Sequence, residues 1–108
     1  MKLLIADDEP LARQRLAALV SELGGHVVAG EAGNGREAVE SAEALGVDVV
    51  LLDISMPVMD GLEAAHHLAS LRAPPAVVFC TAYDQHALAA FEAAAVDYLV
   101  KPVRKERL

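Results

Sequence analysis

The sequence predicts an α/β fold in which a five-stranded parallel sheet is covered by helices on both faces. Short runs rich in Val, Leu and Ile alternate five times with stretches of helical periodicity along the 108 residues. Such alternation is typical of parallel sheets, because a crossover helix has to join each strand to the next. The runs are continuously apolar, as expected for strands buried on both faces. We take residues 1–108 as one domain.

The expected strands lie near residues 2–6, 26–30, 48–52, 76–80 and 97–100. Four of them are followed directly by a residue with a reactive or charged side chain, whereas the second ends at Gly30. Right-handed crossovers leave few possible topologies. The pattern favours a flavodoxin-like strand order of 2-1-3-4-5, with the second strand at one edge and ligands bound between strands 1 and 3.

Start and stop signals delimit the expected helices. The first begins at Pro10, which a first helical turn tolerates, and ends at the glycine pair 24–25. The second begins at Asn34, with Glu37 at the spacing of a capping box, and ends at Gly46.

The third helix repeats this spacing with Asp60 and Glu63, and should stop before the prolines at 74–75. The fourth follows Asp84. The fifth starts after Pro102 and is cut off at Leu108, so we expect it to be truncated.

Five polar residues follow the carboxyl ends of the first, third, fourth and fifth expected strands: Asp7, Asp8, Asp53, Thr81 and Lys101. In an open parallel sheet these ends lie along one edge, where ligand and catalytic groups collect. Three carboxylates, a hydroxyl and an ammonium are a composition suited to a divalent cation and a phosphoryl group. Asp7 and Asp8 alone would more often be a helix cap, so the prediction depends on the whole set.

This composition predicts a Mg²⁺ site, because hard cations prefer oxygen ligands. Asp8 and Asp53 would bind the ion directly, and Asp7 directly or through water. Lys101 and Thr81 would each take a phosphoryl oxygen, since phosphoryl transfer needs positioning and charge neutralisation more than acid–base chemistry. Asp53, after the central strand, is the natural nucleophile and would form an acyl phosphate.

These residues resemble the receiver domains of bacterial two-component response regulators over the whole chain. The matching segments are D-I-S-M-P-V-M-D-G at 53–61, the acidic pair at 7–8, Thr81-Ala82 and Lys101-Pro102. The segments D-D-E-P-L-A-R at 7–13, T-A-Y-D-Q-H-A-L-A-A-F at 81–91 and A-V-D-Y-L-V-K-P-V at 95–103 are similar to the LytR and alginate-regulator (LytTR) subgroup.

The resemblance implies a role for each matching residue. Asp53 accepts a phosphoryl group from the phosphohistidine of a sensor histidine kinase. The backbone carbonyl of Ser55 joins Asp7, Asp8 and Asp53 around Mg²⁺. Thr81 and Tyr98 form the switch, and the Ala82 amide helps to bind phosphate. Structural roles are implied for Pro57, Gly61 and the cis proline Pro102.

The resemblance also implies the partners. A receiver of this subgroup precedes a β-rich LytTR-type DNA-binding domain that regulates transcription, and we expect that output domain to be absent from this chain. Homodimerisation is expected through the face formed by helix 4, strand 5 and helix 5. We expect a switch that assists its own phosphotransfer and autodephosphorylation, not an enzyme acting on other substrates.

Composition narrows the possible partners further. The formal net charge of −7 argues that this domain does not grip nucleic acid itself, because such binding depends on Lys and Arg neutralising phosphates. There is no apolar stretch long enough for a membrane span and no leader-like segment, so we expect a cytoplasmic protein. The single cysteine, Cys80, excludes an internal disulfide and suits a reducing compartment.

Three other functions compete with this interpretation. An aspartyl phosphohydrolase usually carries a second Asp two residues after its nucleophile, where this chain has Ser55. A receiver-like module that binds its partners without phosphate would normally have lost part of the acidic pair or the lysine. A flavodoxin would need a phosphate loop rich in Ser, Thr and Gly after the first strand.

Overall fold

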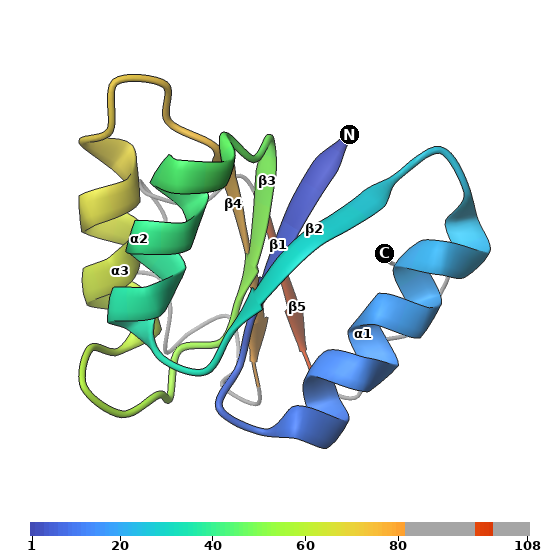
Figure 1. Ribbon diagram of the computed structural model, residues 1–108. Helices are drawn as coiled ribbons and strands as arrows, with labels where there is room; N and C mark the ends of the chain where they lie inside the picture. The colour runs from blue at the N-terminus through green and yellow to red at the C-terminus, as the bar shows by residue number, and fades with distance from the viewer. Residues whose placement is uncertain (82–96, 101–108) are drawn as a thin grey trace.

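The computed structural model describes residues 1–81 and 97–100 (Figure 1). Its elements are β1 (Lys2–Ala6), α1 (Pro10–Leu23), β2 (Val27–Ala32), α2 (Gly35–Leu45), β3 (Val49–Leu52), α3 (Gly61–Ala69), β4 (Ala76–Thr81) and β5 (Asp97–Val100). The five strands form one parallel sheet in the order β2-β1-β3-β4-β5. The predicted fold class and strand order are confirmed. The expected fourth and fifth helices lie outside the described residues.

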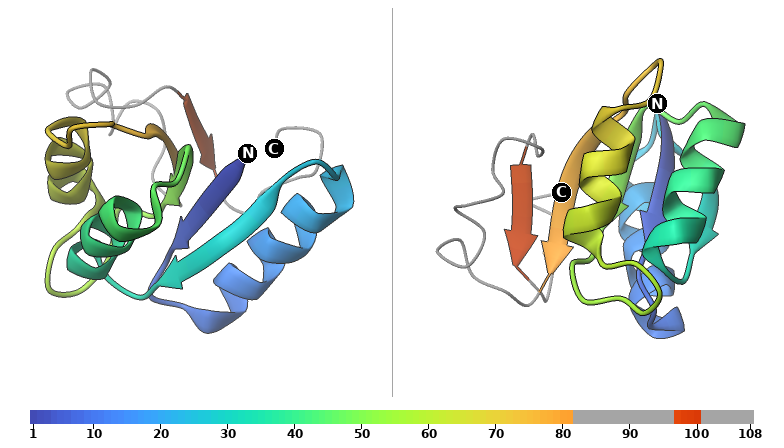
Figure 2. Two further views of the ribbon diagram at one scale, coloured as in Figure 1. Left: turned by 45° about the horizontal axis from the view of Figure 1, so that its top comes forward. Right: turned by 90° about the vertical axis from the view of Figure 1, so that its left-hand side faces the viewer.

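The sheet separates two apolar cores, as Figures 1 and 2 show with α2 and α3 on one face and α1 on the other. Neighbouring residues of a strand contribute to opposite cores, because successive side chains point to opposite faces. Leu4 packs in the larger core under α2 and α3, and Ile5 packs in the smaller core under α1. Both side chains are fully buried. This two-sided burial explains why the strands read as continuous apolar runs.

The second strand differs from its predicted range of 26–30. β2 continues past Gly30, because its pairing with β1 extends to the pair Ala6 and Ala32. The register shifts between Leu3 and Leu4, and a Cβ on Gly30 would come within 2.9 Å of Leu45 Cδ1. Gly30 is therefore a close-packed residue within the strand, whereas the sequence suggested the strand's end.

Capping side chains start two of the helices as predicted. Asn34 Oδ1 accepts a hydrogen bond from the Glu37 amide at 2.9 Å, and Asn34 Nδ2 donates to Glu37 Oε2 at 2.7 Å. At α3 the Asp60 carboxylate accepts from the Glu63 amide at 2.8 Å. Each bond satisfies an amide that would otherwise lack a partner in the first turn.

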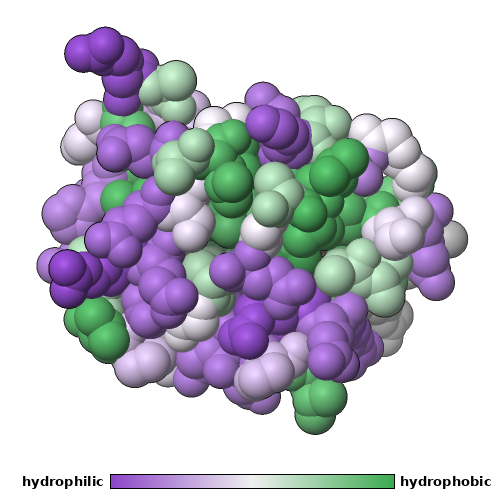
Figure 3. Space-filling view, in the orientation of Figure 1, coloured by the Kyte–Doolittle hydropathy of each residue, from purple (hydrophilic) through white to green (hydrophobic). Residues whose placement is uncertain are grey.

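The surface of the described residues is mostly polar, with a few exposed apolar side chains. In the view of Figure 3, hydrophobic side chains gather between α2 and α1, where the edge strand β2 faces the viewer. Val27 of this strand is 63% exposed. Within the described ranges, no helix combines the length and hydrophobicity that a membrane crossing requires.

Candidate functional site

The register of the central strands brings Asp7 and Asp53 together. Ala6, the last residue of β1, pairs with Leu52, the last residue of β3. The ladder extends one step further, because the Asp53 amide donates to the Ala6 carbonyl at 2.9 Å. On the other side of β1, the Asp7 amide donates to the Ala32 carbonyl at 3.0 Å. Two aspartates that are far apart in sequence therefore leave the sheet side by side.

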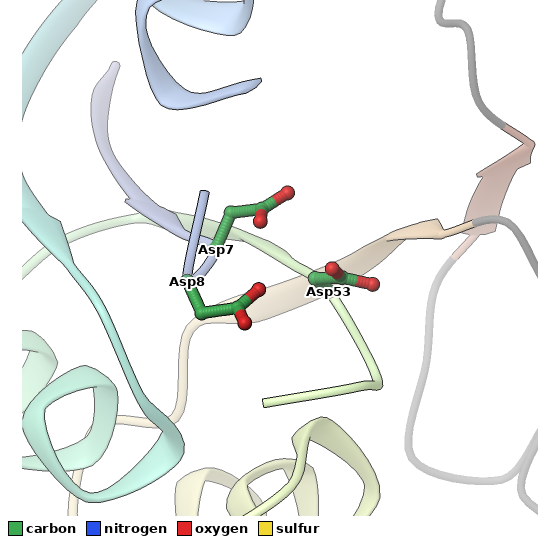
Figure 4. A group of neighbouring side chains, drawn as sticks. All are labelled: Asp7, Asp8 and Asp53. Carbon is green, nitrogen blue, oxygen red and sulfur yellow. The ribbon is translucent and has the colours of Figure 1, made fainter. Parts of the chain in front are cut away.

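Asp8 completes a group of three carboxylates with Asp7 and Asp53 (Figure 4). One oxygen from each lies within 4.8 Å of those from the other two. Asp7 is 1% exposed and Asp53 is 6% exposed, whereas Asp8 is exposed to solvent. The group thus combines two buried aspartates with one that is exposed to solvent.

The donor set fits Mg²⁺. Like charges at these separations repel one another, and the repulsion is stronger where burial lowers the effective dielectric. A divalent cation offsets this repulsion, and carboxylate oxygens are the ligands that Mg²⁺ prefers, usually one or two of them with water completing the octahedron. Each of the three residues offers a carboxylate oxygen that could bind such an ion.

The buried Asp7 is held by three neighbouring groups. One carboxylate oxygen, Oδ1, accepts from the Glu9 amide at 3.0 Å. Its main-chain carbonyl accepts from Arg13 Nη1 at 2.6 Å, and its amide pairs with Ala32 as described above. These contacts fix the main chain of the acidic pair at the point where β1 turns toward α1.

The loop from Asp53 to α3 is anchored by two glycines. The Gly61 amide donates to the Ile54 carbonyl at 2.7 Å, and a Cβ at this position would collide with the Asp53 carbonyl. The Gly35 amide at the start of α2 donates to the Met59 carbonyl at 2.9 Å, and a Cβ on Gly35 would collide with that carbonyl. Both helices therefore approach the loop at distances that only glycine allows.

Val58, at the tip of this loop, has a positive φ of 68°. The Met59 amide donates to the Pro57 carbonyl at 2.7 Å, so Val58 is the central residue of a three-residue turn. A γ-turn with positive φ is rare and strained, and a β-branched side chain is poorly suited to it. Val58 is also 77% exposed, so its apolar side chain gains little packing that would offset the strain.

The remaining predicted site residues are placed less completely. Ser55 lies two residues beyond Asp53, exposed in the loop. The backbone of Thr81, at the end of β4, pairs with Val100 of β5, which lies beside β4 in the right-hand view of Figure 2. Tyr98 pairs with Phe79. Lys101, Pro102 and Ala82 lie outside the described residues.

The sequence analysis did not identify Arg13 and Gly35 as residues that support the site. Arg13 lies in a motif that we used only for its resemblance to a subgroup. Gly35 carried a usable signal, because a glycine at the first position of a helix is a poor helix former and suggests a close backbone approach. No comparable signal in the sequence marks Arg13.

A family model confirms the resemblance drawn from these residues. Residues 3–108 match the model described as "Response regulator receiver domain". The chain belongs to the response-regulator receiver family.

Its relatives include regulators of the two kinds that the sequence motifs resemble. The chain is 57% identical to the "Positive alginate biosynthesis regulatory protein" of Pseudomonas aeruginosa and 41% identical to the "Transcriptional regulatory protein LytR" of Staphylococcus aureus. Each match covers 100% of this chain and 44% of the relative. This receiver therefore spans less than half the length of either regulator.

Solved receiver structures share the fold. The signal receiver domain of the putative response regulator NarL from Mycobacterium tuberculosis has a TM-score of 0.89 and 33% identity, covering 97% of this chain and 86% of that one. The response regulatory domain of mrkE from Klebsiella pneumoniae has a TM-score of 0.87 and 34% identity, covering 99% of this chain and 88% of that one.

Proposed function

We propose that this receiver is a phosphorylation-controlled signalling switch, and that Asp53 accepts the phosphoryl group from a sensor histidine kinase. The observation that carries the proposal is the group formed by Asp53, Asp7 and Asp8 at the carboxyl edge of the sheet. Asp53 follows β3, the central strand of the five. Ligand sites of open α/β sheets lie at this edge, beside the strand where the order reverses.

The proposed transfer needs a carboxylate nucleophile and a stabilised phosphoryl group. A carboxylate oxygen of Asp53 bonds to phosphorus while the bond from phosphorus to the kinase imidazole nitrogen breaks, and the nitrogen keeps the electron pair. When bound by Asp8 and Asp53, with Asp7 and the Ser55 carbonyl in support, Mg²⁺ would neutralise developing negative charge on the phosphoryl oxygens. Lys101, Thr81 and the Ala82 amide would hold the other oxygens.

The proposed switch uses Thr81 and Tyr98. Phosphorylation adds roughly −1.5 to −2 charges and strong acceptors, so it attracts donors such as Thr81 and Lys101. Movement of Thr81 would let the Tyr98 ring turn inward. The unphosphorylated protein must already sample this arrangement, because a ligand only shifts populations between existing states. The backbone pairing of β4 with β5 supports this coupling, since it links the strand of Thr81 to the strand of Tyr98.

The proposed partners follow from the family and from the names of the relatives. A sensor histidine kinase would supply the phosphoryl group in the cytoplasm. The regulated output would be DNA binding by a separate domain of a longer protein, because this acidic chain is a poor ligand for nucleic acid. Homodimerisation through helix 4, strand 5 and helix 5 is part of the proposal, and sedimentation with and without fluoroberyllate tests it.

Intact-mass measurement after incubation with acetyl phosphate tests the acceptor. Wild-type protein should gain one phosphoryl group in the presence of Mg²⁺ and none in its absence. Asp53→Asn should gain none under either condition. Asp60→Asn is a matched control, because it makes the same charge change in the same loop while Asn still caps α3. Equal labelling of Asp53→Asn and wild type would show that the acceptor is another residue.

A further inference from the structure

We infer that Arg13 is a positioning residue for the metal site, holding the main chain of Asp7 so that the Asp7 and Asp8 carboxylates face Asp53. The inference rests on the proposed Mg²⁺ site and adds a residue outside its ligand set. Arg13 lies in the first turn of α1, and its guanidinium turns back toward the end of β1, where it meets the Asp7 carbonyl.

The Arg13 guanidinium joins two segments that flank the acidic group. Nη1 donates to the Asp7 carbonyl at 2.6 Å, and Nε lies 3.0 Å from Glu31 Oε1 in β2. The Arg13 side chain is 21% exposed, less than the 43% of Glu31. This ion pair is partly buried, so it is screened less than a fully solvated pair. It therefore helps to hold the guanidinium in the orientation that contacts Asp7.

The contact from Arg13 to the Asp7 carbonyl acts on the peptide group between Asp7 and Asp8. The Asp7 amide is held by Ala32, and the bond from Arg13 to the Asp7 carbonyl orients the next peptide group. Asp8 is exposed, and the plane of that peptide is one of the rotations that set the direction of its side chain. Replacing a group that orients metal ligands typically weakens metal affinity by about 10- to 100-fold.

The positioning role and the charge of Arg13 predict opposite changes in Mg²⁺ affinity when this residue is replaced. A guanidinium next to the acidic group repels Mg²⁺, so its charge alone would weaken metal binding and its removal would tighten it. If positioning dominates, removal weakens binding. Arg13→Lys separates the contribution of charge from that of positioning. Lysine keeps the positive charge, but its single ammonium cannot replace the planar guanidinium that contacts both Asp7 and Glu31.

The test compares Arg13→Lys and Arg13→Gln with wild type and with Arg15→Gln. Arg15 is exposed on the same helix, so Arg15→Gln makes the same change in net charge without touching Asp7. Mg²⁺ is titrated into each protein while amide NMR signals are followed. Arg13→Gln should raise the dissociation constant about 10-fold or more relative to Arg15→Gln, and Arg13→Lys should raise it by a similar factor relative to wild type, whose charge it keeps. In metal-free protein, the Asp8 amide signal should shift in both Arg13 variants, because it shares a peptide group with the Asp7 carbonyl.

Three results would overturn the inference. Tighter or unchanged Mg²⁺ binding in Arg13→Gln would mean that charge outweighs positioning, and wild-type affinity in Arg13→Lys would mean that the two-partner bridge is unnecessary. An unmoved Asp8 signal in Arg13→Lys would mean that the bridge does not form in solution. If wild type and Arg15→Gln fail to bind Mg²⁺, the proposed function fails instead. Arg13→Lys keeps the test decisive if Arg13→Gln does not fold.

Discussion

Gly61 lies against the main-chain carbonyl of Asp53 so closely that its α-carbon has no room for a methyl group. The Gly61 amide also donates to the Ile54 carbonyl at 2.7 Å. The first residue of α3 is therefore packed directly on the backbone of the candidate phosphoryl acceptor. The position of Asp53 depends on a residue that has no side chain and takes no part in the chemistry.

Gly61→Ala should lower the free energy of unfolding by about 2–3 kcal/mol, because the new methyl group forces α3 away from Asp53. Gly33→Ala is the matched control. A Cβ on Gly33 would meet its nearest neighbour, Arg13 Nη1, at an ordinary 3.7 Å, so its effect should stay within about 0.5 kcal/mol. Urea unfolding measures both values. Equal stability of the two variants would contradict the close approach at Gly61.

Val58→Gly should raise the free energy of unfolding by about 1 kcal/mol, because glycine adopts positive φ without steric cost and little packing is lost. Val27→Gly is the control, since Val27 is also an exposed valine but lies in a strand. There the same change should be destabilising by about 1 kcal/mol. Thermal and urea unfolding of both variants would test the opposite signs, and a loss of stability in Val58→Gly would argue against strain.

Mg²⁺ should stabilise the folded protein, because the three carboxylates come together only in that state. At a free concentration 100 times its dissociation constant, the gain is about 2.7 kcal/mol. Asp8→Asn and Asp53→Asn should lose most of this gain, whereas Asp60→Asn should keep it. In metal-free buffer, Asp53→Asn should be at least as stable as wild type, because one repelling charge is gone. Denaturant unfolding of wild type and the three variants, with and without Mg²⁺, measures these differences in stability.

Lys101→Ala should retain Mg²⁺ binding and lose the response to a phosphoryl mimic. An ammonium contributes to binding an anionic phosphoryl group and repels a cation, so its removal should not weaken the metal site. NMR titration with Mg²⁺ and then with fluoroberyllate separates the two steps. In wild type the second step should shift signals of β5 as well as those of the acidic group. Collapse of Mg²⁺ affinity in a folded Lys101→Ala would disprove the assigned role.

The sequence predicted those parts of the fold that depend on local patterns. Apolar runs located the five strands, and the pairs Asn34–Glu37 and Asp60–Glu63 marked the starts of α2 and α3. The acidic group was also predictable, because the ends of parallel strands share one edge of the sheet. These features need no knowledge of side-chain packing between distant segments.

Long-range packing accounts for what the sequence did not reveal. The extension of β2 to Ala32 depends on pairing with β1, and the collision that excludes a side chain at Gly35 depends on the loop at Met59. The bridge from Arg13 to Asp7 and Glu31 likewise joins three segments whose contact only the folded chain reveals. A motif indicates that such a residue is present, but its partners come from tertiary structure.

The pairing of Ala6 with Leu52 also makes the acidic group dependent on contacts between distant parts of the chain. The acidic group needs residues from both ends of a segment of more than forty residues, and β2 and α2 lie within that segment. Closing so long a loop costs conformational entropy, and only the contacts that form when the strands pair offset this cost. An unfolded copy therefore has no assembled acidic group, and under the proposed function it would not accept phosphoryl groups. Only correctly folded protein would take part in signalling.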